Sequence, residues 1–195
     1  MRILYMNQGG GGQWGAIKYA NYDLVLLAES NVLKEGFSLN WESKTNPVMS
    51  IQQKDGAGRI ITEVTDLDVT AQQVRPMVTF TTKDGIRVVF VHLKSGSVNF
   101  ATYALEAAID AVKKKTQFDP KPLILWIGDF NRADGKLMDE LGAKTIFSGG
   151  GQAWWDLDRA YISGDWKNYE IIASTPAKAG ADHDHAAIGF EYCRK

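Results

Sequence analysis

The sequence is poor in cysteine, and its charges nearly cancel. Cys193 is the single cysteine among 195 residues, which excludes an intrachain disulfide framework and any cysteine-rich metal site. Lysine and arginine together number 22 against 23 acidic residues. The protein therefore lacks a global positive field for nucleic acid, and polyanion binding would need a local patch.

Long apolar runs are also lacking. No segment approaches the length of a membrane-spanning helix, so we expect no membrane span. The first residues, Met1-Arg2, lead directly into the strand-like residues 3–6 without the pattern of a signal peptide. We therefore expect a cytoplasmic protein, or a domain that is delivered or secreted by another route.

The composition that remains is typical of a globular protein, with 45% apolar and 23% charged residues. The chain has no internal repeat, linker or low-complexity segment. A chain of this length fits one domain with a sizeable core. We expect a single domain over residues 1–195, and a monomer.

Short apolar or alternating segments between turns predict many strands and few helices. An apolar stripe predicts a helix over residues 99–115, with shorter helices near 13–22 and 136–141 and a loop over 37–46. The expected strands cover residues 3–6, 23–28, 48–51, 59–64, 77–82, 86–91, 123–127, 157–162, 169–173 and 187–192. Consecutive hairpins favour antiparallel pairing, so the pattern predicts an α/β fold with a largely antiparallel core of two sheets.

Asp129 and Asn131 follow the apolar strand at residues 123–127. Residues two apart on a strand point to the same side, so both side chains can face one ligand, and Gly128 permits close approach of the backbone. A carboxylate beside a carboxamide suits a metal-bound water and a phosphoryl oxygen. The alternative is an Asx turn at the end of a strand.

Other polar residues with catalytic potential also lie at strand ends or in the adjacent turns. They are Asn7, Glu29, His92, Asp158, Asp182 and His183. If neighbouring strands are antiparallel, these residues meet at one edge, where the acids would repel one another without a cation. Oxygen ligands favour Mg²⁺ or Mn²⁺. A zinc site of His92, His183 and His185 is the alternative, and the number of acids argues against it.

The order of these residues resembles the endonuclease/exonuclease/phosphatase superfamily, whose founding member is pancreatic deoxyribonuclease. The resemblance implies a four-layer α/β/β/α sandwich, with two central, largely antiparallel mixed sheets and the active site at one edge. The matching segments are the Asn7 strand end, Ala28-Glu29-Ser30, His92, Gly128-Asp129-Phe130-Asn131, Leu157-Asp158-Arg159 and Asp182-His183.

Three further segments are similar to the catalytic B subunits of cytolethal distending toxins. They are Met6-Asn7-Gln8-Gly9, Gly58-Arg59 and Arg75-Pro76. One position departs from the superfamily pattern, because Ala181 stands where a serine commonly precedes the Asp-His pair.

The resemblance implies a metal ligand and a general base. Glu29 would bind the cation, with Asn7 and Asp182 as near ligands or holders of its water. His183 would be the general base that takes a proton from the attacking water, and Asp158 would orient it and stabilise its charged form.

The remaining residues would contact the nucleophile and the phosphate. Asp129 and Asn131 would position both. His92 would donate a hydrogen bond to a non-bridging oxygen or protonate the leaving group. Arg59 and Arg75 would neutralise phosphate charge.

These roles predict a Mg²⁺-dependent phosphodiesterase, foremost a DNA endonuclease with nucleic acid as its partner. Trp154 and Trp155 could stack on bases, although packing is the simpler role. A phosphatase of phosphoinositides or other small phosphoesters is the first alternative, and a non-catalytic binding module on the same scaffold is the second. Because no acid or histidine of the set is replaced, the sequence argues against the binding module.

Overall fold

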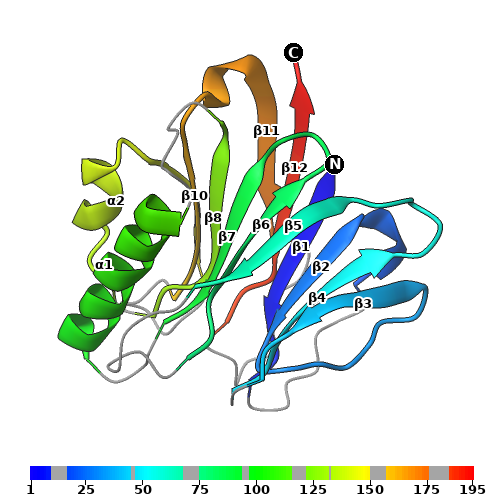
Figure 1. The fold of residues 1–195 in the computed structure, drawn as a ribbon, viewed down its shortest axis with the longest axis horizontal. Helices are drawn as coiled ribbons and strands as arrows, with labels where there is room; N and C mark the ends of the chain where they lie inside the picture. Colours follow the sequence, from blue (N-terminus) through cyan, green and yellow to red (C-terminus); the bar gives the residue numbers. More distant parts are fainter. Residues whose placement is uncertain are drawn as a thin grey trace.

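Two sheets packed face to face form the centre of the protein in a computed structural model (Figure 1). The structure describes residues 1–9, 17–44, 47–67, 75–93, 97–115, 122–131, 133–149, 157–175 and 185–195. No described helix has the length and apolar character needed to cross a membrane.

The first sheet has six strands in the order β11-β12-β1-β2-β4-β3. Among them, β1 and β2 are parallel and the other neighbours are antiparallel. The strands are β1 (Arg2–Asn7), β2 (Leu24–Ala28), β3 (Phe37–Glu42), β4 (Met49–Lys54), β11 (Tyr169–Ser174) and β12 (Ile188–Arg194).

The second sheet has six strands in the order β5-β6-β7-β8-β10-β9. Here β7 and β8 are parallel, and the other neighbours are antiparallel. Both sheets are therefore mixed and largely antiparallel, which confirms the predicted core. The strands are β5 (Ile61–Asp66), β6 (Val78–Thr82), β7 (Arg87–His92), β8 (Ile124–Asp129), β9 (Lys144–Gly149) and β10 (Asp158–Ser163).

The main apolar core lies between the sheets and follows from the alternation of side chains along each strand. On β7, Val88 and Phe90 join this inter-sheet core, whereas Val89 and Val91 face outward. The strands β2 and β8 are buried along their whole length. Both faces of these two strands are covered, which explains why their sequences are apolar along most of their length.

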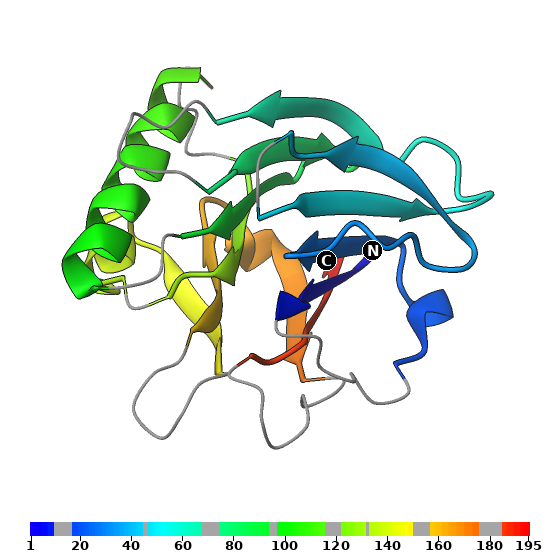
Figure 2. The ribbon, with the colours of Figure 1, turned by 90° about the horizontal axis from the view of Figure 1, so that it is seen from below.

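Helix α1 (Val98–Lys115) covers the outer face of the second sheet, together with the short α2 (Lys136–Glu140) (Figures 1 and 2). Leu105 and Val112 of α1 share a buried apolar cluster with Trp126 of β8. The predicted helices near 99–115 and 136–141 are confirmed. Residues 10–16 of the helix expected near 13–22 lie outside the described residues, and Tyr19–Asn21 form a short 3₁₀ turn, η2.

Two edge strands differ from the sequence prediction. Residues 37–46 were expected to form a loop, but β3 covers Phe37–Glu42, and β9 was not predicted at all. In both strands most side chains are at least partly exposed. The sequence of β3 alternates between apolar and polar residues, so it carried a strand signal and the loop prediction was wrong. The sequence of β9 does not alternate, and an edge strand that pairs on one side only needs no such alternation, which explains why β9 was missed.

Candidate active site

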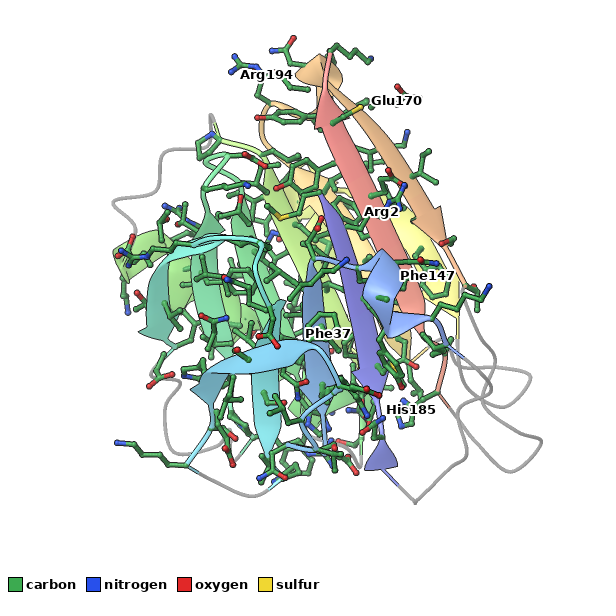
Figure 3. All side chains as sticks on the ribbon, turned by 90° about the vertical axis from the view of Figure 1, so that its right-hand side faces the viewer. Arg2, Phe37, Phe147, Glu170, His185 and Arg194 are labelled. Atoms are coloured by element: carbon green, nitrogen blue, oxygen red, sulfur yellow. The ribbon has the colours of Figure 1, made fainter. Side chains whose placement is uncertain are left out.

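The strand register brings the polar strand ends to one edge of the sandwich. In the second sheet His92 pairs with Asp129, and Asp129 pairs in turn with Asp158. In the first sheet Asn7 pairs with Ala28, directly before Glu29. Figure 3 shows His185 near the end of β1, with Arg194 at the opposite edge of the sheet.

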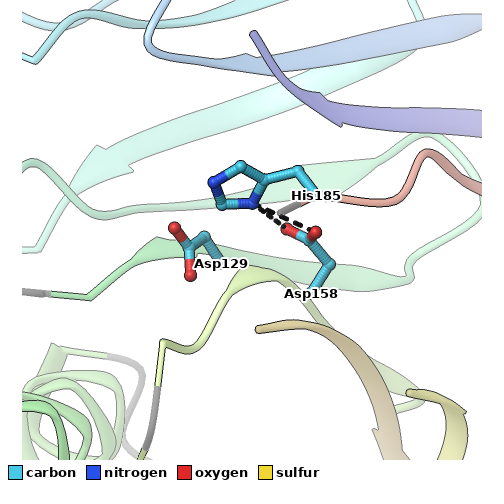
Figure 4. Close-up of side chains that lie close together, drawn as sticks. All are labelled: Asp129, Asp158 and His185. Atoms are coloured by element: carbon cyan, nitrogen blue, oxygen red, sulfur yellow. Dashed lines mark hydrogen bonds and ion pairs between the residues drawn. The ribbon is translucent and has the colours of Figure 1, made fainter. Parts of the chain in front are cut away.

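Asp158 is fully buried and surrounded by hydrogen-bond donors. Its Oδ1 accepts from the Tyr5 hydroxyl at 2.8 Å, and its Oδ2 accepts from the Ala186 backbone N–H at 2.7 Å. The Nδ1 atom of His185 lies 3.1 Å from Oδ2 and 3.2 Å from Oδ1 (Figure 4). With both oxygens occupied by protein donors, this carboxylate is suited to orienting an imidazole and poorly suited to binding a cation.

The histidine at Asp158 differs from the expected one. His183 was predicted to pair with Asp158, but the described residue that occupies this position is His185. His183 and Asp182 lie outside the described residues. The sequence contained a usable signal, because 182–185 hold two Asp-His pairs and the second directly precedes the apolar strand. The backbone N–H of Ala186 binds the same carboxylate and keeps the adjacent imidazole close.

Asp129 and Asn131 form the Asx turn that was the alternative in the sequence prediction. The backbone N–H of Asn131 donates to Asp129 Oδ1 at 2.7 Å, and Asn131 has a left-handed φ of 46°. The Asn131 amide donates to the Leu93 carbonyl at 2.6 Å. The second oxygen of Asp129 accepts from Asn7 Nδ2 at 3.1 Å, so the turn aims this carboxylate into the site.

Glu29 stands at the end of β2 in a strained conformation, with a φ of 58°. Non-glycine residues rarely occupy this region, and such strain is concentrated at functional sites. The carboxylate is partly exposed, and its Oε1 lies 3.2 Å from Nε2 of the fully buried His92. His92 thereby connects Glu29 of the first sheet with Asp129 of the second, whose Oδ2 is 3.6 Å from the same nitrogen.

Arg75 joins this group, as predicted, and Arg59 does not. The Arg75 guanidinium contacts His92 Nε2 and lies 3.8 Å from Glu29 Oε1. Arg59 instead donates to the carbonyls of Ile61 and Thr62.

The prediction that Arg59 binds substrate is therefore corrected. Ile61 pairs with Thr82, at the end of β6 where Thr81 pairs with Arg87. From Arg87 to His92 the strand advances five residues, which places Arg59 about 16 Å from the site along the sheet. Because β5 is antiparallel to β6, a residue that opens β5 lies at the far edge.

Burial and mutual charge shift the pKa values on the Asp158 side. Burial, followed by the charge of Asp158, raises the pKa of Asp129 to about 7. Burial also raises the pKa of Asp158, against the opposing hydrogen bond from His185. Burial lowers the pKa of His185, but the hydrogen bond and charge of Asp158, with the charges of Asp129 and Glu29, outweigh it and raise this pKa to about 9.

Near Glu29 the pKa values are lowered instead of raised. Burial lowers the pKa of His92 to about 4, despite its hydrogen bond with Glu29. That hydrogen bond, together with the charge of Arg75, lowers the pKa of Glu29 even though the carboxylate is partly buried. At neutral pH the site therefore contains a neutral His92 beside an ionised Glu29.

Two groups of side chains could hold a cation. Ligand atoms of Asp129, Asp158 and His185 all lie within 4.8 Å of one another. Because Asp158 and His185 are already bonded to each other, we favour the oxygens around Gly9. A Cβ atom on Gly9 would lie 2.0 Å from Glu29 Oε2 and 3.2 Å from Asn7 Oδ1, so glycine lets both side-chain oxygens lie close to the backbone here. This donor set fits a hard cation.

By sequence, no family matches the chain and no curated protein is similar to it. Solved structures match over its whole length. Humanized D. rerio TDP2 has a TM-score of 0.71 at 14% identity, covering 99% of this chain and 98% of that one. An endonuclease/exonuclease/phosphatase family protein from Bacteroides thetaiotaomicron has a TM-score of 0.67 at 12% identity, covering 100% and 98%.

This is the endonuclease/exonuclease/phosphatase fold. The predicted sandwich is thus confirmed, and the polar edge described above belongs to a chain with this fold. The human Nocturnin catalytic domain with a bound sulfate anion shares it, with a TM-score of 0.63 at 14% identity, covering 99% of this chain and 93% of that one.

Proposed function

We propose that the protein is a Mg²⁺- or Mn²⁺-dependent phosphodiesterase that hydrolyses nucleic acid, with DNA cleavage by an endonuclease as its leading activity. The observation that carries the proposal is the Asp158–His185 pair facing Asp129 at the edge where Glu29 and His92 also meet. A structural neighbour, D. rerio TDP2 in complex with a single-strand DNA product, supports nucleic acid as the substrate class.

His185 is the general base of this proposal. Its Nδ1 is held by Asp158, which leaves Nε2 to accept a proton from the attacking water. Asp158 stabilises the imidazolium that forms, because its carboxylate already lies within hydrogen-bond distance. Asp129 lies directly opposite Asp158 in the pairing of β8 with β10, and it positions the attacking water on the side away from His185.

The phosphate is bound by His92 and Arg75. Because burial lowers the pKa of His92 to about 4, this imidazole is neutral and donates a hydrogen bond to a non-bridging oxygen. Of the two roles considered for His92, hydrogen bonding is therefore favoured over protonation of the leaving group. Arg75 supplies the positive charge that a phosphodiester anion requires.

Glu29, with the Asn7 side-chain oxygen, would hold the cation. A hard dication bound there would polarise the phosphoryl oxygen, stabilise the leaving alkoxide and lower the pKa of His185 toward the range of a general base. Asp182 was also predicted to contribute, and it lies outside the described residues.

A phosphatase acting on phosphoinositides or another small phosphoester is the second candidate. Of the two arginines expected to bind phosphate, Arg75 alone reaches the site, and a small phosphoester needs fewer basic contacts than a polymer. The finer likeness to cytolethal distending toxin subunits loses the support of Arg59, because this residue lies away from the site. The complete Asp158–His185 pair argues against a non-catalytic module.

The deciding experiment compares three substrates, each with Mg²⁺ and with EDTA. Supercoiled plasmid and a single-stranded oligonucleotide report nuclease activity, and vesicles containing phosphoinositides report phosphate release. Nicking of plasmid in Mg²⁺ alone supports the proposal. Phosphate release from the lipid without cleavage of nucleic acid supports the phosphatase, and inactivity on all three contradicts both.

A further inference from the structure

Tyr5 contributes a polar group to the site from inside the apolar core. On β1, Ile3 and Tyr5 point between the two sheets, and Asn7 follows two residues later on the same face. Tyr5 is fully buried, and its hydroxyl donates to Asp158 Oδ1 at 2.8 Å. Asn7 donates to Asp129 at 3.1 Å. One strand of the first sheet therefore contacts both buried carboxylates of the second.

The Tyr5 ring is held firmly in place. It packs edge-on against Phe90 of β7, with ring centroids 5.9 Å apart and an interplanar angle of 75°. A buried hydroxyl is costly unless it forms a hydrogen bond, and Asp158 provides the acceptor. Because the ring is fixed by close packing, the position of the hydroxyl fixes Oδ1 of the carboxylate.

The two donors on Asp158 determine the plane of its carboxylate. Ala186 holds Oδ2 through its backbone, and Tyr5 holds Oδ1 through its hydroxyl. In this orientation both oxygens lie 3.1 to 3.2 Å from His185 Nδ1. Without the hydroxyl, the carboxylate keeps one rigid donor among the described residues and can rotate away from the imidazole.

We propose that Tyr5 is a positioning residue that orients Asp158 and, through it, the imidazole of His185. The proposal rests on the proposed function, in which His185 is the general base. Tyr5 itself does not contact the substrate.

The first test is Tyr5→Phe, which removes one hydroxyl and preserves the ring. We expect kcat to fall by about tenfold to a hundredfold with KM unchanged, as is usual for groups that hold a functional side chain in place. Tyr192→Phe is the matched control, because Tyr192 lies in the same inter-sheet core and its hydroxyl contacts Thr82 instead. An equal loss in both variants, or no loss in Tyr5→Phe, overturns the proposal.

A double-variant comparison separates positioning from general weakening of the fold. In a His185→Ala background, Tyr5→Phe should have no further effect on kcat, because the residue it acts through is gone. A further loss of the same size as in the wild-type background overturns the proposal.

A spectroscopic readout distinguishes failure of this inference from failure of the proposed function. NMR of protein labelled at histidine nitrogens detects the Nδ1 proton of His185 without any substrate. We expect a slowly exchanging signal in the wild-type protein and in Tyr192→Phe, and its broadening or loss in Tyr5→Phe. If no substrate is hydrolysed but this pattern is found, the positioning role stands and the proposed function fails. An unchanged signal in Tyr5→Phe overturns the inference.

Discussion

Asp129 and Asp158 stand directly opposite each other in the antiparallel pairing of β8 and β10, and both are buried. Their surroundings differ. Asp158 is occupied by Tyr5, His185 and Ala186, whereas Asp129 keeps an oxygen directed at Asn7 and His92. Because the donors around each carboxylate differ, Asp158 is suited to orienting a base and Asp129 to positioning the attacking water.

The first prediction concerns pH and stability without metal. The pKa of Asp129 is raised from 3.8 to about 7 and that of His185 from 6.5 to about 9, so both groups bind protons more tightly in the folded protein. The stability that they contribute is present at low pH and is lost as pH rises through these values. In EDTA, Tm should fall between about pH 6 and about pH 9.

Magnesium provides the control for this prediction. A cation at Glu29 and Asn7 lowers the pKa values of the neighbouring Asp129 and His185 toward their unfolded values, so Tm in Mg²⁺ should depend less steeply on pH over the same interval. A Tm in EDTA that rises or stays level between these pH values would show that the pKa values of Asp129 and His185 are not raised in the folded protein.

The second prediction concerns Gly9→Ala. A Cβ at this position displaces the end of the Glu29 side chain, which is flexible, so stability should change by less than about 1 kcal/mol. The affinity for Mg²⁺, measured from the dependence of activity on its concentration, should fall by about tenfold or more. Gly135→Ala is the matched control, because its Cβ would meet only the Tyr161 hydroxyl at 3.7 Å. Equal Mg²⁺ affinity in both variants would refute the assignment of the Glu29 and Asn7 oxygens to the cation.

The third prediction concerns Gly128, which has a φ of 147° and packs against β7. A Cβ there would lie 1.9 Å from the Val91 carbonyl oxygen, so the two parallel strands would have to separate. We expect Gly128→Ala to lower the free energy of unfolding by at least about 3 kcal/mol in urea denaturation. Gly36→Ala has a positive φ but no neighbour within 4 Å, and it should cost about 1 kcal/mol. Similar losses of unfolding free energy in the two variants would show that β7 and β8 accommodate a Cβ at position 128 without separating.

The fourth prediction separates the two arginines. Arg75→Ala removes the guanidinium beside Glu29 and His92, and KM for an oligonucleotide should rise by about tenfold, the effect of losing one charge-assisted hydrogen bond. Arg59→Ala should leave KM unchanged, since its guanidinium contacts backbone carbonyls at the far edge. The assignment fails if Arg59→Ala has the larger effect.

Much of the site was predictable because chemistry and strand position agree. Asp129 ends an apolar strand, and Glu29 ends another, so both could be placed at one edge from the sequence. Arg59 was wrongly assigned to the site because the sequence alone does not reveal at which edge of the sheet a strand begins. That depends on the antiparallel pairing of β5 with β6.

Other contacts depend on the register between distant strands. Tyr5 lies within an apolar segment and has the composition of a core residue, so its bond to Asp158, 153 positions away, left no local signal. The assignment of His183 rather than His185 has a different cause. Two adjacent Asp-His pairs have equal chemistry, and the choice between them depends on position: the second pair directly precedes the apolar strand, and Ala186 beside it donates to Asp158.

The most direct test measures kcat on one oligonucleotide in Mg²⁺ for the wild type, His185→Ala and His183→Ala. Loss of a positioned general base costs about a hundredfold to ten-thousandfold. We predict this loss for His185→Ala, with circular dichroism and Tm showing an intact fold, and activity close to wild type for His183→Ala. Full activity in His185→Ala, or a loss confined to His183→Ala, would contradict the assignment of the Asp158–His185 pair as the catalytic centre.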